Sequence, residues 1–334
     1  MFSHAHFCEV VFCTGLIAGL LLGQVTAAGQ TGAAGSSYLA LTTPRRVLPD
    51  AQPWEVNEFP HTLSVLELKR GGFRYWGWYG LNEGRGIGLT RSNDLVNWSK
   101  YAENPLWTNA RWPSAIAHAD PRNKATLYFA ITRDYDTPSS RIVLASSQDG
   151  IHLKEEKELV AGAPDQRNQN PNLFRDPRSG RFYLTFYRGN DHDHFEIISR
   201  SATTVPDLDK AAEKILLQTN ETVAAPTLLY VKNVPGAKEK KTGVYFLATE
   251  IYPHRYTDNP EGEWQVKVFA ADSPDGNFQP GQSGHARTAR VLVPAHFQKP
   301  VLRIRLPSGQ PRSLGARGDR GFITVACSES GPQG

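Results

Sequence analysis

A pattern of about 55 residues recurs along the middle of this chain, and a repeat of that length limits the possible folds more than any other feature. Each copy begins near a proline that leads into a short apolar strand, and an aromatic-rich second strand follows after a turn. A third apolar strand comes next, closed in most copies by a turn that contains Asp or Gly. The prolines that mark the copies are Pro60, Pro113, Pro171 and Pro226.

Units of this kind predict a β-propeller. A single four-stranded unit cannot cover both faces of its own sheet, so successive units must stack around an axis. The aromatic second strands are expected at residues 75–79, 127–131, 182–187 and 244–248. We predict an all-β, five-bladed β-propeller over residues 54–300, with the fifth blade drawn from the C-terminal segment and completed by N-terminal strand material. An open β-sandwich is the alternative, and residues 208–217 fit one short helix.

The two ends of the chain depart from the repeat. Residues 10–23 are apolar and Val25-Thr26-Ala27 offers a cleavage site, so residues 1–27 are predicted to be a signal peptide. An uncleaved anchor is the alternative, but the run is shorter than the roughly 20 residues of a membrane span. Residues 28–53 are rich in Gly, Ala and Thr and predict a flexible leader. Residues 301–334 lack an aromatic strand, so we expect an irregular tail and a last blade that need not be complete.

The charge and the cysteines favour an exported protein that does not bind nucleic acid. The formal net charge is only +4 and the Lys and Arg residues are scattered, whereas nucleic-acid binders concentrate them on one face. Cys8 and Cys13 lie in the predicted signal peptide, which leaves Cys327 without an internal disulfide partner. We therefore expect a secreted or periplasmic monomer with no stable membrane span once the signal is removed.

Two stretches of the repeat resemble the five-bladed propeller glycosidases. The sequence GIGLTRSNDLVNW at 86–98 is similar to a blade ending in the family-43 arabinanases and β-xylosidases and in their family-32 invertase relatives. The sequence NPNLFRDPRSGRFYL at 170–184 resembles a blade opening in the same enzymes. The likeness covers residues 54–280, and it implies a carbohydrate ligand.

The resemblance also implies three acidic residues near the axis, two Asp and one Glu, that serve as base, pKa tuner and acid. This chain departs from that pattern at each place. Phe59 stands where the first Asp is expected, one residue after Glu58. Asn170 replaces the second Asp, and Ala224 replaces the Glu. Because an alanine cannot donate a proton, these roles are not carried over.

Propeller geometry predicts a ligand site on separate grounds. The start of the first strand and the loop between the second and third strands lie on the same face of every blade, and here they carry carboxylates, amides, Arg and aromatic residues. Such side chains suit sugar hydroxyls and ring faces. Glu250 is the candidate acid because it follows the apolar strand at 244–249, where burial favours a protonated carboxyl. Glu58 is the candidate base. The candidate substrate-binding residues are His61, Arg111, Trp112, Asn170, Asp134, Asp136, Arg188, Asp191 and Tyr252.

Plainer interpretations stand beside these assignments. Glu58 and Glu250 could be solvated residues at strand ends, and Asp134 and Asp136 could belong to an ordinary polar loop. Trp76 and Trp78 alternate on one strand and therefore share a face, which favours packing between blades over sugar stacking.

No cofactor is expected. The sequence DHDH at 191–194 has the composition of a metal cluster, but a loop of alternating charges needs no metal, so no metal ligand is assigned. The family likeness makes a structural Ca²⁺ conceivable, yet no residue identifies its site. Two functions remain open: a secreted glycoside hydrolase that uses carboxylate general acid/base chemistry on an oligo- or polysaccharide, and a carbohydrate-binding propeller without activity.

Overall fold

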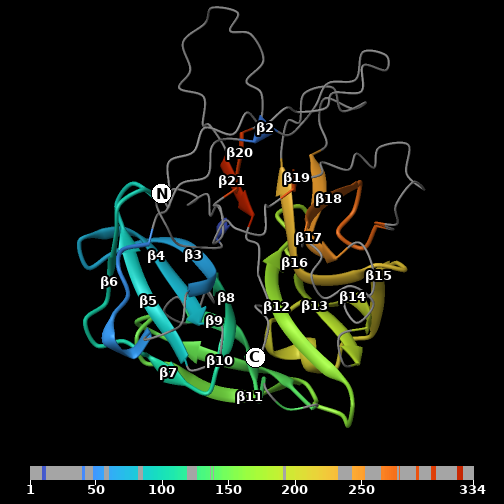
Figure 1. Ribbon diagram of the computed structural model, residues 1–334, viewed down its shortest axis with the longest axis horizontal. Coiled ribbons are helices and arrows are strands. Elements are labelled where there is room, and N and C mark those ends of the chain that lie inside the picture. The colour runs from blue at the N-terminus through green and yellow to red at the C-terminus, as the bar shows by residue number, and fades with distance from the viewer. Residues whose placement is uncertain are drawn as a thin grey trace, which may run out of the picture.

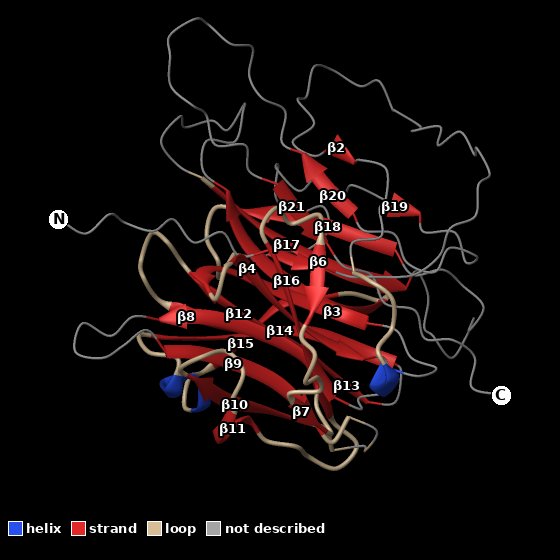
Figure 2. Ribbon diagram, turned by 90° about the vertical axis from the view of Figure 1, so that its left-hand side faces the viewer, coloured by secondary structure: helices blue, strands red, loops and turns tan. Residues whose placement is uncertain are grey.

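The computed structural model of the chain describes residues 10–12, 40–41, 48–55, 60–81, 86–118, 126–135, 137, 139–190, 193–231, 243–252, 265–276, 278, 291–292, 302–305 and 322–325. These residues form strands almost throughout, with two short 3-10 helices, η1 (Pro53–Glu55) and η2 (Pro206–Asp209) (Figure 2). The predicted all-β class is confirmed.

Four antiparallel sheets follow one another along the chain and form a β-propeller arrangement (Figure 1). Blade 1 contains β3 (Pro60–Arg70), β4 (Phe73–Leu81), β5 (Gly86–Ser92) and β6 (Trp98–Lys100), with β7 (Trp107–Thr108) also paired to β5. Blade 2 contains β8 (Arg111–His118), β9 (Thr126–Arg133), β10 (Arg141–Ser147) and β11 (Lys154–Val160). Blade 3 contains β12 (Arg167–Arg175), β13 (Phe182–Asn190), β14 (Asp193–Ala202) and β15 (Glu213–Gln218). Blade 4 contains β16 (Thr222–Val231), β17 (Val244–Tyr252), β18 (Gln265–Ala271) and β19 (Val291–Leu292).

A further sheet of three short strands joins β2 (Ala40–Leu41), β20 (Leu302–Arg305) and β21 (Phe322–Val325). Its strands come from the N-terminal and C-terminal segments, the two sources from which the fifth blade was predicted. Four blades are thus observed among the described residues, and the count of five stays a prediction. The helix considered at 208–217 does not form, because β15 supplies the fourth strand of blade 3 and pairs with β14.

One strand comes from the predicted signal peptide. β1 (Val10–Phe12) pairs antiparallel with β3, so that Val10 lies opposite Val65. Cleavage after Ala27 would remove this strand from blade 1, and both the signal peptide and its cleavage stay predictions. No helix among the described residues has the length and apolar character needed to cross a membrane.

The first strands of successive blades are joined by hydrogen bonds at equivalent positions. The hydroxyl of Ser64 in blade 1 accepts from the backbone N–H of Ala115 at 2.9 Å. The hydroxyl of Ser114 in blade 2 accepts from Leu173 N–H at 2.8 Å, and the Asn172 amide oxygen in blade 3 accepts from Leu228 N–H at 3.0 Å. Each bond satisfies a backbone donor on the first strand of the next blade, where no further strand of the sheet would do so.

This series also corrects the repeat landmark in the first blade. Ser114 directly follows Pro113, and Ser64, its equivalent, directly follows Leu63. Leu63 rather than Pro60 therefore corresponds to the prolines of the other blades. The turn predicted after this strand is confirmed, since Gly71 and Gly72 have φ of 59° and 78° between β3 and β4, a conformation that glycine adopts without a steric penalty.

The core lies between the blades. Trp76 and Trp78 are buried against Phe129 of blade 2, with the Trp78 and Phe129 ring centroids 5.0 Å apart. The indole N–H of Trp78 donates to the Gly150 carbonyl at 2.8 Å. These two tryptophans therefore pack between blades, the interpretation that the sequence favoured. Similar apolar layers join blade 2 to blade 3 and blade 3 to blade 4.

Candidate ligand-binding site at the propeller axis

Blades 2, 3 and 4 each carry a β-bulge near the start of the first strand. The residue before the landmark proline has a left-handed conformation in all three, with φ of 49° at Trp112, 51° at Asn170 and 48° at Ala225. Pairing with the second strand is interrupted at the same places. Non-glycine residues adopt this conformation rarely, and such bulges and backbone strain concentrate beside functional sites.

The bulges place equivalent residues of three blades at one end of the axis. Immediately before each bulged residue stand Arg111, Gln169 and Ala224. Their cross-strand partners on the second strands are Thr132, Tyr187 and Glu250, respectively. Ring contacts, hydrogen bonds and electrostatic interactions join residues at these positions to their neighbours, and we call the following set the axis cluster: Arg111, Trp112, Tyr135, Gln169, Asn170, Tyr187, Ala224 and Glu250.

The centre of the axis cluster is a guanidinium between two aromatic rings. The Arg111 guanidinium carbon lies 3.8 Å from the Trp112 ring centroid and 3.8 Å from that of Tyr135. The two rings meet edge to face at 5.2 Å, and Trp112 also meets Tyr187 at 6.4 Å. Arg111 and Trp112 are both only 4% exposed. The stack therefore holds a buried cation against two aromatic rings.

Tyr187 and Gln169 link blade 3 to the loop that follows β9. The Tyr187 hydroxyl donates to Oε1 of Gln169, whose Nε2 donates to the Tyr135 carbonyl at 3.1 Å and to the Ser140 hydroxyl at 2.9 Å. Burial raises the pKa of Tyr187, the Arg111 charge opposes that rise, and the Glu250 carboxylate adds to it. Tyr187 is therefore a neutral phenol within electrostatic range of Arg111 and Glu250.

Glu250 lies within β17 rather than after it, and its residue is 1% exposed. It stands directly opposite Ala224, the position where the family resemblance implies a glutamate. Side chains directly opposite in an antiparallel pair leave the same face, with Cβ atoms about 4.5–5.5 Å apart. A carboxyl group is thus present beside that position.

Asn170 and Tyr252 are both buried. Asn170 is 6% exposed, and its side-chain oxygen has no hydrogen-bond partner among the described residues. A buried amide oxygen in that state favours a donor supplied by a ligand. Tyr252 is the last residue of β17, is fully buried, and lies opposite Thr222.

Two predicted binding residues engage charged partners within their own blades. Asp134 accepts from Arg141 Nε at 2.8 Å, and this bond lowers the pKa of Asp134. Arg188 forms a paired contact with Glu213 on β15, at 2.5 and 2.8 Å, and also donates to the Asn168 side chain. Both therefore stabilise their blades whether or not they meet a ligand.

The remaining candidates fall outside the described part of the chain. Glu58, Asp136 and Asp191 lie there, together with the DHDH metal candidate for the most part. The backbone of His61 belongs to β3, but its side chain is outside the described atoms. Among the described residues no group of three or more His, Cys, Asp or Glu side chains is arranged to hold a metal ion.

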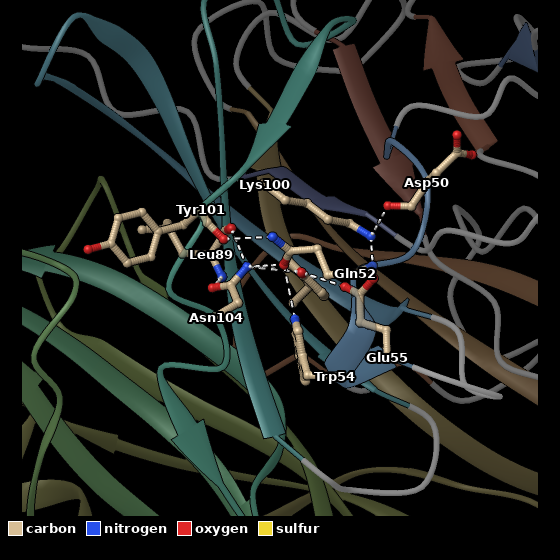
Figure 3. Close-up of polar contacts among 9 residues, drawn as sticks. Asp50, Gln52, Trp54, Glu55, Leu89, Lys100, Tyr101 and Asn104 are labelled. Atoms are coloured by element: carbon tan, nitrogen blue, oxygen red, sulfur yellow. Dashed lines mark hydrogen bonds and ion pairs between the residues drawn. The ribbon is translucent and has the colours of Figure 1, made fainter.

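A second polar cluster joins residues 50–55 to blade 1 (Figure 3). Glu55 of η1 is completely buried and accepts from Lys100 Nζ at 2.5 Å, from the Tyr79 hydroxyl at 2.6 Å and from the Gln52 N–H at 2.6 Å. Asn104 donates to the Tyr79 oxygen at 3.2 Å. Burial, followed by the Glu55 charge, raises the pKa of Tyr79. This cluster fastens residues 48–55 to blade 1 and has the satisfied geometry of a structural clamp.

Sequence reasoning placed Arg111, Trp112, Asn170 and Glu250 in the axis cluster but missed Tyr135, Gln169 and Tyr187. Gln169 did carry a signal, because it precedes its landmark proline by the same spacing as Arg111. Tyr187 carried none, since aromatic residues occur in every second strand, and Tyr135 lies in the polar loop after β9 between Asp134 and Asp136.

Comparison with known proteins gives structural likeness only. No protein-family model matches this sequence, and no curated protein matches it either. An α-L-arabinanase from Penicillium chrysogenum, complexed with arabinobiose, is similar at 14% identity and a TM-score of 0.49, over 86% of each chain. An endo-arabinase from Bacteroides thetaiotaomicron is similar at 10% identity and a TM-score of 0.48, over 87% of this chain and 98% of that one. A thermostable family-43 glycoside hydrolase is similar at 15% identity and a TM-score of 0.47, over 82% and 94%.

Proposed function

We propose that this chain is an exported glycoside hydrolase that binds an oligo- or polysaccharide at the axis cluster. The observation that carries the proposal is the convergence of Arg111 and Trp112 from blade 2, Tyr187 from blade 3 and Glu250 from blade 4, each beside the bulge of its own blade. No single blade holds all four side chains, so the complete site exists only because the sheets surround an axis.

The chemistry of the axis cluster suits a sugar. A pyranose or furanose ring presents an apolar face and an edge of hydroxyls. Trp112 and Tyr135 supply aromatic surface for the face, while Arg111 and the amide of Asn170 supply donors and acceptors for the edge.

Glu250 is the proposed general acid. A carboxyl held in a buried position favours its protonated form and can give that proton to the glycosidic oxygen as the C–O bond breaks. A second carboxylate then takes a proton from the attacking water, whose oxygen bonds to the anomeric carbon. Glu58 is the proposed base, and inversion would require it to lie roughly 6.5–9.5 Å from Glu250.

The test uses a screen of plant and bacterial polysaccharides with product analysis. Glu250→Gln should lower turnover by at least about a hundredfold, the usual size of a general acid's contribution, while leaving the unfolding midpoint close to that of the wild type. Glu156→Gln is the matched control, because Glu156 is exposed on β11, the edge strand of blade 2 opposite to β8, and its carboxylate accepts from the Ser146 hydroxyl. Unchanged turnover in Glu250→Gln would remove Glu250 from the mechanism.

One observation favours a second function, a carbohydrate-binding propeller without activity. Asn170 and Ala224 occupy positions where the family resemblance implies carboxylates. The same screen separates the two functions: a glycan that is bound and recovered uncut supports binding alone, whereas shortened products support hydrolysis.

Export and the monomeric state belong to the same proposal. Expression with the natural N-terminus should give a mature protein that begins after Ala27, as read by N-terminal sequencing, and that elutes as a monomer in gel filtration. A protein that keeps residues 1–27 would contradict the signal peptide and would leave β1 paired with β3.

A further inference from the structure

We infer that Gln169 is a positioning residue that sets the affinity of the axis cluster by holding Tyr135 and Tyr187 against Trp112. This inference rests on the proposed carbohydrate function. Gln169 lies at the bulge of β12 and is 1% exposed, so its side chain contacts other protein groups rather than solvent.

The hydrogen bonds of Gln169 fix the orientation of its amide. The Tyr135 carbonyl can only accept, so the amide nitrogen must face it, and the second N–H of that nitrogen reaches the Ser140 hydroxyl. Oε1 then faces Tyr187, whose hydroxyl must donate. Both amide protons and the amide oxygen are thereby used, and a flipped amide would set two acceptors against each other.

The partners of this one side chain belong to two blades. Tyr135 and Ser140 are in the loop after β9 of blade 2, and Tyr187 is on β13 of blade 3. Both tyrosine rings touch Trp112, at 5.2 and 6.4 Å between centroids. Gln169 therefore joins the two tyrosines that flank Trp112. The ring of Tyr135 in turn covers the Arg111 guanidinium at 3.8 Å.

Loss of the two N–H donors of Gln169 should loosen Tyr135 and leave the bond from Tyr187 in place. Gln169→Glu keeps the shape and an acceptor for Tyr187, but its carboxylate would face the Tyr135 carbonyl without a proton. Ser140→Ala removes one partner of Gln169 while leaving both tyrosines intact. Gln148→Glu is the matched control, because it makes the same chemical change at an exposed residue in a turn.

The experiment measures binding and Trp112 geometry separately. Arabinohexaose and xylohexaose are titrated into each variant by calorimetry, and near-UV circular dichroism is recorded against the matching Trp112→Phe protein to isolate the Trp112 band. Gln169→Glu should raise Kd by at least about tenfold and weaken that band. Ser140→Ala should change Kd and the Trp112 band in the same direction but by less, and Gln148→Glu should change neither Kd nor the band.

Wild-type Kd and a full Trp112 band in Gln169→Glu would overturn the inference while leaving the carbohydrate function standing. If the wild type binds neither oligosaccharide, those ligands are rejected, and the circular dichroism still decides the role of Gln169. Should Gln169→Glu fail to fold, Ser140→Ala supplies the same two measurements, and an unchanged band and Kd in that variant would overturn the inference.

Discussion

Glu250 lies directly opposite Ala224 across the β16–β17 pair, so the carboxylate missing from the first strand of blade 4 stands on its neighbour instead. The two Cβ atoms of such a pair are about 4.5–5.5 Å apart. Both side chains therefore leave the same face of the blade 4 sheet.

The first prediction exchanges these two side chains. Glu250→Ala should lose hydrolysis. Adding Ala224→Glu should raise the rate at least about tenfold above that of Glu250→Ala, because the carboxylate returns to the same face. Initial rates on the polysaccharide found by the screen give the answer. Ala224→Gln in the Glu250→Ala background is the control, since it adds the volume without the acid, and equal rates in the two double variants would contradict the exchange.

A second prediction concerns the bonds between blades. Ser114→Ala leaves the buried N–H of Leu173 without its acceptor, and an orphaned buried donor costs about 1–3 kcal/mol. Urea unfolding should show that loss as a lower midpoint with an unchanged slope. Ser146→Ala is the control, because the Ser146 hydroxyl meets only the exposed Glu156. Equal midpoints for the two variants would show that the bond between blades contributes nothing.

The clamp of residues 48–55 gives a third prediction. Lys100→Met leaves the completely buried Glu55 carboxylate without its cation and should lower the free energy of unfolding by about 3–5 kcal/mol. Glu55→Leu combined with Lys100→Met replaces the pair by apolar groups and should be more stable than Lys100→Met alone. A double variant that is less stable than the single one would contradict the clamp.

A fourth prediction follows from Glu213 on β15. Hydrogen bonds from Arg188, opposed by burial and supported by Arg200, lower the pKa of Glu213 from 4.5 to about 2. Because the folded pKa is below the unfolded one, this carboxylate stabilises the protein above about pH 4.5, and that contribution disappears as the pH falls towards 2.

The comparison is between wild type and Glu213→Gln. The wild type should be more stable at neutral pH, and the difference in urea midpoint should shrink progressively below about pH 4.5. A difference that stays constant over that range would show that Glu213 does not titrate as the ion pairs require.

The sequence predicted the all-β class and the strands of four blades because each blade carries its own turns, apolar strands and aromatic second strand. It placed Arg111, Trp112 and Asn170 correctly at strand starts because the landmark prolines mark those positions. The first blade shows the limit of that signal: Pro60 resembles the other landmarks, yet the bonds of Ser64 assign the equivalent position to Leu63.

The contacts between blades were beyond sequence reasoning. Gln169 acts through a loop of the preceding blade, and no local pattern specifies such a partner. The same holds for Asp134, which pairs with Arg141, and for Arg188, which pairs with Glu213. The sequence does not distinguish a charged residue with such a partner from one that binds a sugar. The Glu55 clamp was missed because it joins a segment without a repeat pattern to a lysine on β6.

The most direct test of the axis cluster as a sugar site is the affinity of Trp112→Ala, measured by calorimetry with the glycan that the wild type binds. We predict at least a tenfold rise in Kd, about 1.4 kcal/mol, with wild-type affinity retained by Trp54→Phe, because Trp54 packs on Tyr79 of blade 1. Equal affinity in Trp112→Ala and the wild type would place the sugar elsewhere and contradict the account.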